Sequence, residues 1–239
     1  MTPRIARSQP RRRWPSPELA GGEWPVMRRT LTEILHDAAC GRFPPPDGST
    51  TVVPQESRRD AGVIAFTAHS VVFTDESPDW VHATLAALDC DGLAATMNAH
   101  FLSAFLTRTG RSTDTIDLLT VAPALPGEPP LRLREIADPD HPRVVSARKR
   151  RHNVRVWAAD GGIVLLGQGV AGRWETAIEV DETVRHRGLG RTLATAARHL
   201  VPAGAPVWSQ QAAGNARSIR AFQAAGFRPV GAEALLIAT

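Results

Sequence analysis

Two glycines between a predicted strand and a predicted helix constrain this chain more than any other feature. The segment Val180–Arg191 contains Arg185-x-x-Gly188-x-Gly190, with an apolar stretch before it and a helical pattern after it. Glycine permits positive φ angles and lets a ligand approach the backbone closely. The first amides of a helix lack internal partners and lie at the positive end of its dipole. The segment therefore predicts a phosphate or pyrophosphate site, to which further arginines at 187 and 191 add charge; a tight turn without a ligand is the alternative.

Regular elements surround this segment in a definite order. Residues 174–180 predict a strand, 190–201 an amphipathic helix and 206–211 a second strand. Asn215 predicts the N-cap of another helix, which ends at Gly226 and is followed by a last strand over 227–237.

In these residues the chain resembles the GNAT superfamily of N-acyltransferases. That family's pyrophosphate loop reads Gln/Arg-x-x-Gly-x-Gly/Ala, which Arg185, Gly188 and Gly190 match. Its second signature reads Asn-x-x-Ala/Ser-x-x-x-Tyr-x-x-x-Gly-Phe, and the chain has Asn215, Ser218, Phe222, Gly226 and Phe227 in that register. The resemblance extends from near Leu131 to the last strand.

The resemblance implies acetyl-CoA or another acyl-CoA as donor, a primary amine as acceptor, and direct transfer between them. It implies that the loop holds the pyrophosphate and that the backbone from Ile178 to Val180 follows the pantetheine arm. The Val180 amide would polarise the thioester carbonyl, and Asn215 is open to either cofactor contact or helix capping. The expected cofactor-binding residues are Ile178, Val180, Arg185, His186, Arg187, Gly188, Leu189, Gly190, Arg191, Asn215, Ser218 and Phe222.

Glu175 and Glu179 are the candidate catalytic residues. Both point to one face of the predicted strand because they are an even number of residues apart. The family often places a water-activating carboxylate on this strand, so we expect Glu175 to be the general base and Glu179 to be the next candidate. A solvated strand face is the alternative, and His141 and His152 are more distant candidates.

Phe222 departs from the family pattern, which has a tyrosine there as general acid. The chain contains no tyrosine at all. A thiol with a pKa of about 8.5 can leave as thiolate near neutral pH, or water or Ser218 can protonate it. The departure motivates a second hypothesis, a non-catalytic acyl-CoA-binding regulatory module.

Composition weighs against other partners. The net charge is only +4, and the 28 basic residues include one lysine, Lys149, a bias typical of GC-rich bacterial genomes. The run Arg11–Arg13 predicts a solvated tail, and no aromatic interleaving supports a third hypothesis, nucleic-acid binding. Cys40 and Cys90 have no metal-ligand spacing, so no metal is expected.

No apolar run approaches the length of a membrane span and no secretory signal is evident, which favours a cytoplasmic protein without a membrane partner. The oligomeric state stays open, with a homodimer as one option.

The chain divides, by these patterns, at a proline-rich linker near residues 123–130. We expect a disordered tail over 1–20, a smaller N-terminal helical or α/β domain over 21–127, and a GNAT-like acyl-CoA-binding catalytic domain over 128–239. The predicted fold class is α/β of the α+β type, with a mixed, mostly antiparallel sheet flanked by helices. The acceptor is expected in the groove between the two domains, where Trp174 could line it or simply pack in the core.

Overall fold

A computed structural model describes residues 29–238 of the chain. The predicted tail over 1–20 and its arginine run lie outside the described residues. The α-helices are α1 Leu31–Ala39, α2 Pro78–Ala86, α3 Ala99–Thr109, α4 Pro142–Arg148, α5 Leu189–Leu200 and α6 Ala216–Ala224. Short 3-10 turns are η1 Ala95–Met97, η2 Val170–Gly172 and η3 Glu182–Val184.

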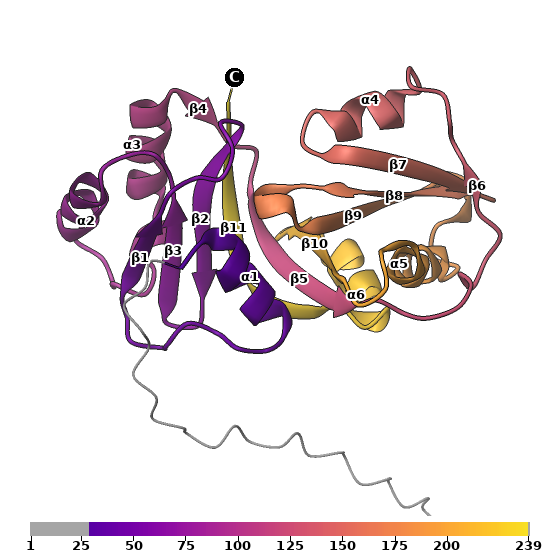
Figure 1. The fold of residues 1–239 in the computed structure, drawn as a ribbon, viewed down its shortest axis with the longest axis horizontal. Coiled ribbons are helices and arrows are strands. Elements are labelled where there is room, and N and C mark those ends of the chain that lie inside the picture. Colours follow the sequence, from indigo (N-terminus) through magenta and orange to yellow (C-terminus); the bar gives the residue numbers. More distant parts are fainter. Residues whose placement is uncertain (1–28, 239) are drawn as a thin grey trace, which may run out of the picture.

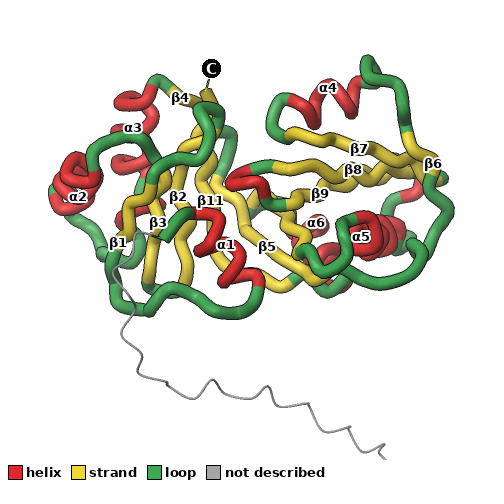
Figure 2. The backbone as a smooth tube through the Cα atoms, viewed as in Figure 1, coloured by secondary structure: helices red, strands yellow, loops and turns green. Residues whose placement is uncertain are grey.

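Eleven strands form one continuous sheet (Figures 1 and 2). They are β1 Thr50–Val53, β2 Asp60–Phe66, β3 His69–Phe73, β4 Arg111–Ser112, β5 Ile116–Pro123, β6 Arg134–Glu135, β7 His152–Ala159, β8 Gly162–Gln168, β9 Trp174–Val180, β10 Pro206–Ala212 and β11 Arg228–Ala238. The order is β1-β3-β2-β11-β5-β10-β9-β8-β7-β6, with β4 paired to β11. Within residues 29–238 only β1–β3 and β9–β10 are parallel pairs. The mixed, mostly antiparallel sheet confirms the predicted fold class.

Strand β5 lies between the two halves of the molecule (Figure 1). It precedes the predicted linker in sequence, yet it pairs antiparallel with both β10 and β11. The segments on either side of the predicted boundary at 127 and 128 therefore contribute to the same sheet, and an additional N-terminal domain is not confirmed as a separate unit.

Alternation along the strands divides the helices between the two faces of the sheet. Helices α5 and α6 cover a core that includes Trp157, Val207 and Phe222, and α2 and α3 cover Val63 and Leu236 on the same face. Helices α1 and α4 lie on the opposite face. Figure 1 shows α4 and α5 on opposite sides of β8 and β9. The carboxylates of β9 thus point to the α4 side, away from the main α5 core.

Strands β9 and β10 pair over a short length only. Trp174 is in register with Val207 and Glu175 with Trp208, whereas all of β9 pairs with β8. Beyond Glu175 the two parallel strands diverge, so residues 176–180 present an edge that β10 does not cover. This divergence positions the candidate site.

Candidate active site

The turn into α5 has the geometry of an anion site. Its N-cap is Gly188, with φ at +85°, and His186 two residues earlier has φ at +67°. A Cβ added at Gly188 would meet nothing within 4 Å, so the cap is open to approach. The first intrahelical bond runs from the Thr192 amide to the Gly188 carbonyl at 3.2 Å. The amides of residues 189–191 precede it and lie at the positive end of the helix.

Among the α-helices of residues 29–238, only α5 has no side-chain cap. The other five have one, from Thr30, Ser77, Asn98, His141 and Asn215. A side-chain cap satisfies amides that would otherwise need water or a ligand. The first turn of α5 is therefore the helix start at which an external acceptor has most to offer.

Positive charge surrounds this turn. Arg187 and Arg191 are exposed and form no ion pair with any described residue. Arg185 lies 3.1 Å from a carboxylate oxygen of Glu182 and donates to the Val180 carbonyl at 3.3 Å. The loop arginines thus belong to the same turn as the uncapped amides.

Helix α5 begins close to the strand and helix that flank it. A Cβ at Gly190 would lie 3.7 Å from side-chain atoms of Ile178, Val180 and Ala221, which is ordinary packing distance. Ile178 and Val180 direct their side chains into the α5 core, so only their backbone is available on the β9 edge. Leu189 packs against the same core. Trp174 also packs there rather than on the α4 face.

Helix α6 uses its signature residues for its own structure. Asn215 Oδ1 accepts the Ser218 amide at 3.1 Å, which caps the helix. Phe222 is 2% exposed, and its ring meets Phe227 edge-on at 4.9 Å between centroids. The structure therefore places Phe222 in the core, where its ring is shielded from solvent.

Glu175 lies at the centre of a buried ion-pair network. Arg173 Nε donates to its Oε1 at 2.8 Å, Gln210 Nε2 donates to the same oxygen at 3.0 Å, and Arg151 Nε lies 2.9 Å from Oε2. Arg173 also donates to Glu233 Oε2 at 2.8 Å. The network ties β9 to β10 and β11 at the point where β9 and β10 begin to diverge.

This environment does not favour Glu175 as a general base. Burial would raise its pKa, but the charges of Arg173 and Arg151 outweigh that effect and hold the pKa below its ordinary value. A carboxylate that is ionised and fully hydrogen-bonded takes up a proton poorly. Glu179 is half-exposed and pairs with Arg143 of α4. The two predicted carboxylates share a face, as expected, but their surroundings differ.

A cavity of about 230 Å³ opens beside this network, on the α4 face. Thr176 and Ala177 of β9 line it from one side and Gln210 of β10 from another, so it reaches the point where these strands separate. Asp117 of β5 and Glu233 of β11 line it too, and they are register partners in the sheet. The pKa of Asp117 is raised to about 6, mainly by burial and secondly by the negative charge of Glu233, although the positive charge of Arg150 opposes the shift.

Sequence reasoning missed Asp117, Glu233, Arg173 and Gln210. The available signal was a charged residue within an apolar strand, as in the segment around Asp117. Such residues are rarely buried without a partner or a function. Their convergence depends on β5 lying between β10 and β11, which local patterns do not reveal.

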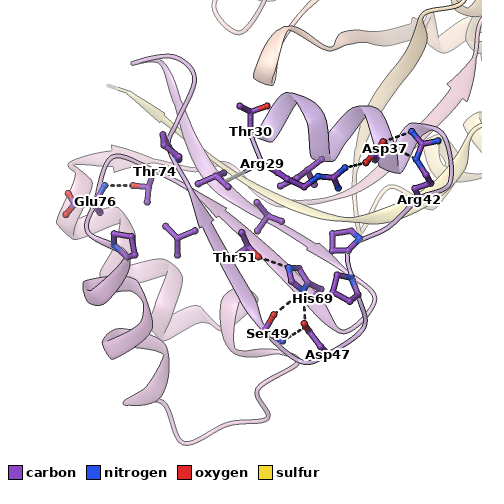
Figure 3. A pocket seen from close by; sticks show the side chains of 18 of the residues that line it. Arg29, Thr30, Asp37, Arg42, Asp47, Ser49, Thr51, His69, Thr74 and Glu76 are labelled. Carbon is purple, nitrogen blue, oxygen red and sulfur yellow. Dashed lines mark hydrogen bonds and ion pairs between the residues drawn. The ribbon is translucent and has the colours of Figure 1, made fainter. Parts of the chain in front are cut away.

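A larger cavity of about 750 Å³ lies beside α1, β1 and β3 (Figure 3). Its main polar cluster is internally satisfied: His69 Nδ1 lies 3.0 Å from Asp47 Oδ1, and His69 Nε2 lies 3.0 Å from Thr51 Oγ1. Asp37 likewise binds Arg29 and Arg42. The hydrogen bonds in this cavity hold the turn before β1 in place.

The remaining candidate histidines and the two cysteines lie in surroundings that indicate no catalytic or metal-binding role. His141 accepts the Arg143 amide as the cap of α4, and His152 is exposed at the start of β7. Cys40 and Cys90 are free and exposed. Within residues 29–238 no group of three or more metal-ligating side chains converges, and no helix there is both long and apolar enough to cross a bilayer.

Comparisons with known proteins give a partial likeness. No protein-family model and no curated protein matches the sequence. Among solved structures, the chain is similar to a GCN5-related N-acetyltransferase from Kribbella flavida, with a TM-score of 0.37 and 16% identity over 57% of this chain and 63% of that one. It is also similar to a tandem GNAT protein from the clavulanic acid biosynthesis pathway, at a TM-score of 0.35 and 16% identity over 57% of each chain.

A GCN5-related N-acetyltransferase from Sphaerobacter thermophilus gives a TM-score of 0.36 and 11% identity over 58% of this chain and 56% of that one. The chain thus spans less than two thirds of the length of each of these three structures. At such scores the likeness assigns no role to any residue here.

Proposed function

We propose that this protein is an N-acyltransferase that moves an acetyl or other acyl group from acyl-CoA directly to a primary amine. The observation that carries the proposal is the position of the uncapped α5 start at the end of β9, on the strand that diverges from β10. In a CoA molecule a pyrophosphate joins the nucleotide to an extended arm that ends in the thiol. An anion site followed by an open strand edge matches both parts.

In this proposal the amides of residues 189–191 bind the pyrophosphate, and Arg187 and Arg191 neutralise its charge. The pantetheine arm lies along the β9 edge from Ile178 to Val180, where it pairs with backbone groups as an added strand would. A free backbone amide of this edge polarises the thioester carbonyl as negative charge develops on its oxygen. His186 lies in the same loop, and the capping residue Asn215 contacts the donor at the rim of the site.

The thioester then lies where β9 and β10 separate, beside the cavity of about 230 Å³. An amine in that cavity can attack the carbonyl carbon without an enzyme nucleophile. The thiolate leaves without a tyrosine acid, because its pKa of about 8.5 is low enough near neutral pH.

Glu175 acts in this account as a structural anchor for the diverging strands, and Glu179 stays a proposed catalytic alternative. A second candidate function is a non-catalytic acyl-CoA-binding regulatory module. Phe222 favours it, because a phenyl ring buried in the core supplies no proton to a departing sulfur.

The donor site is tested by calorimetric titration of the full chain with acetyl-CoA. Gly188→Asp should weaken binding about 100-fold or more, because a like charge beside a pyrophosphate costs several kcal/mol. Gly204→Asp is the matched control: Gly204 has φ at +81° and open space within 4 Å, but it follows the other end of α5.

The control should keep wild-type affinity, since the backbone strain of an aspartate is similar at the two positions. Absence of acetyl-CoA binding by the wild-type chain, or equal binding by both variants, would contradict the proposed donor site.

A further inference from the structure

We infer that the cavity between β5, β9, β10 and β11 selects a primary amine of net positive charge, and that Asp117 takes the proton from its ammonium group. This inference rests on the proposed acyl transfer, and it names the class of acceptor and the base. It moves the base from β9, where the sequence suggested it, to β5.

The charges around the cavity do not balance. Four carboxylates face three guanidinium groups in and beside it, namely Asp114, Asp117, Glu175 and Glu233 against Arg150, Arg151 and Arg173. Each arginine already has a partner: Arg150 binds Asp114, Arg151 binds Glu175, and Arg173 bridges Glu175 and Glu233. Asp117 forms no ion pair within residues 29–238. One negative charge is therefore left for a ligand.

The position of that charge is unfavourable without a cation. Asp117 and Glu233 are directly opposite each other in the β5–β11 ladder, and like charges in this arrangement destabilise a sheet. Glu233 is 1% exposed, and its Oε1 has no hydrogen-bond partner. A buried acceptor without a donor is costly, and an ammonium group between the two carboxylates would satisfy both.

The size of the cavity limits what enters. Its volume of about 230 Å³ is below the range of about 300–1,000 Å³ typical of sites for drug-sized ligands. The cavity therefore suits a small primary amine or the aminoalkyl end of a longer molecule. Leu235 and Ile237 supply apolar wall for the carbon chain of such an amine.

The reaction balances with these groups alone. The acceptor ammonium gives one proton to the Asp117 carboxylate, and the neutral nitrogen attacks the thioester carbon. The carbon–nitrogen bond forms, the carbon–sulfur bond breaks, and CoA leaves as thiolate. The second nitrogen proton passes to the sulfur, and Asp117 releases its proton to solvent. An ammonium and an acyl-CoA thus yield an amide, free CoA and one proton.

Asp117 is suited to this task by its surroundings. Glu233 faces it from β11 and Asp114 from the segment before β5, while Arg150 approaches from the end of α4. Glu175, Arg151 and Arg173 lie farther into the same wall and bind one another. With a pKa raised to about 6, Asp117 is ionised at neutral pH and accepts a proton more readily than an ordinary aspartate.

The first test measures the pH profile of kcat/KM for the full chain with acetyl-CoA and a short alkylamine. Wild-type activity should fall below pH 6, as Asp117 becomes protonated. Asp117→Asn should lower kcat/KM about 100-fold at pH 8, a typical loss for a general base. Its residual rate should rise about tenfold per pH unit toward the pKa of the amine, with no inflection near pH 6.

Asp89→Asn is the matched control. Asp89 is exposed in the segment after α2, and this substitution removes one negative charge, as Asp117→Asn does. It should leave the profile unchanged. Retention of the inflection in Asp117→Asn, or activity within about threefold of wild type, would overturn the role of Asp117.

The second test uses the wild-type chain and so does not depend on how a variant folds. Primary amines of similar length that carry net charges of +1, 0 and −1 are compared as acceptors. We expect kcat/KM to fall at least tenfold at each step, because the added carboxylate meets Asp117 and Glu233. Equal or reversed preference would overturn the cationic selectivity. Acetyl-CoA affinity, measured separately, shows whether a failure lies in this inference or in the proposed donor site.

Discussion

The two cavities described here differ in whether their polar groups have partners, and this difference does not follow their volumes. The larger, beside α1, is about three times the volume of the smaller one between the diverging strands. In the larger cavity His69, Asp47 and Thr51 satisfy one another. In the smaller, Asp117 lacks a counter-ion and Glu233 retains a buried oxygen without a donor. Unmatched polar groups, rather than volume, mark the place where a ligand has something to contribute.

The comparison also separates two uses of buried charge. The carboxylate of Glu175 is fully engaged, because two arginines and a glutamine bind it. Such a network fixes geometry and takes little part in proton transfer. Asp117, on the same wall, forms no ion pair with any residue of the described range 29–238. We therefore propose that these neighbouring carboxylates divide into a structural one and a catalytic one according to their partners.

The largest expected effect is on the free energy of unfolding, and it tests the structural role of Glu175. Glu175→Gln should lower the free energy of unfolding by about 3–5 kcal/mol, because it leaves buried guanidinium groups without their counter-ion. Chemical denaturation measures the loss. Glu179→Gln on the same strand is the control and should change stability by less than about 1 kcal/mol, since that pair is half-exposed. A loss in Glu175→Gln no greater than in the control would show that the network does not hold the strands.

A smaller effect is expected in the larger cavity. Thr51→Val removes the hydroxyl that His69 Nε2 contacts and should lower the free energy of unfolding by about 1–3 kcal/mol. Acetyl-CoA affinity and the transfer rate should stay within twofold of wild type. Loss of either, in a variant that still melts cooperatively, would mean that the larger cavity belongs to the active site.

The smallest effect concerns the pH dependence of stability, and its sign distinguishes the two carboxylates. The pKa of Asp117 is raised from 3.8 to about 6 in the folded protein, so the folded state binds the proton more readily. Its contribution therefore decreases the stability as pH rises through that window. Glu175 has a lowered pKa and contributes stability that is lost as pH falls below its ordinary range. Asp117→Asn should melt at a higher temperature than wild type at pH 8 but not at pH 4; the opposite order would contradict the unpaired charge.

Local signals in the sequence located the loop and its flanking elements well. The strand predicted over 174–180 matches β9, and the helix predicted over 190–201 differs from α5 by one residue at each end. Glycines, helix caps and apolar periodicity act over a few neighbouring residues, so these elements follow from the local chain. The Asn215 cap of α6 is confirmed for the same reason.

Other elements depend on distant partners and were predicted less well. The sequence predicts a helix over 138–151, but α4 covers only Pro142–Arg148, with His141 as its cap. The sequence also predicts a strand over 131–136, of which only Arg134–Glu135 forms, paired with the end of β7. Strand β1 was not predicted; its four residues gain their order from β3, a parallel neighbour that a short local pattern cannot identify.

The same distinction between local signals and distant partners applies to the candidate site. The proposed donor side is a local motif and was visible in the residues around Gly188. The acceptor side combines residues from β5, β10 and β11, and two of its carboxylates meet only through the β5–β11 ladder. The family resemblance placed the base on β9, because the family often has a water-activating carboxylate on this strand, whereas the ion pairs of Glu175 become apparent only in three dimensions.

The most direct test of the account is CoA release by the full chain with acetyl-CoA and a cationic primary amine, measured together with the mass of the amine product. We expect CoA and acetylated amine in equal amounts, a rate that depends on amine concentration, and loss of both products in Gly188→Asp but not in Gly204→Asp. Tight binding of acetyl-CoA with no acylated product from any amine would contradict catalysis and favour the regulatory module.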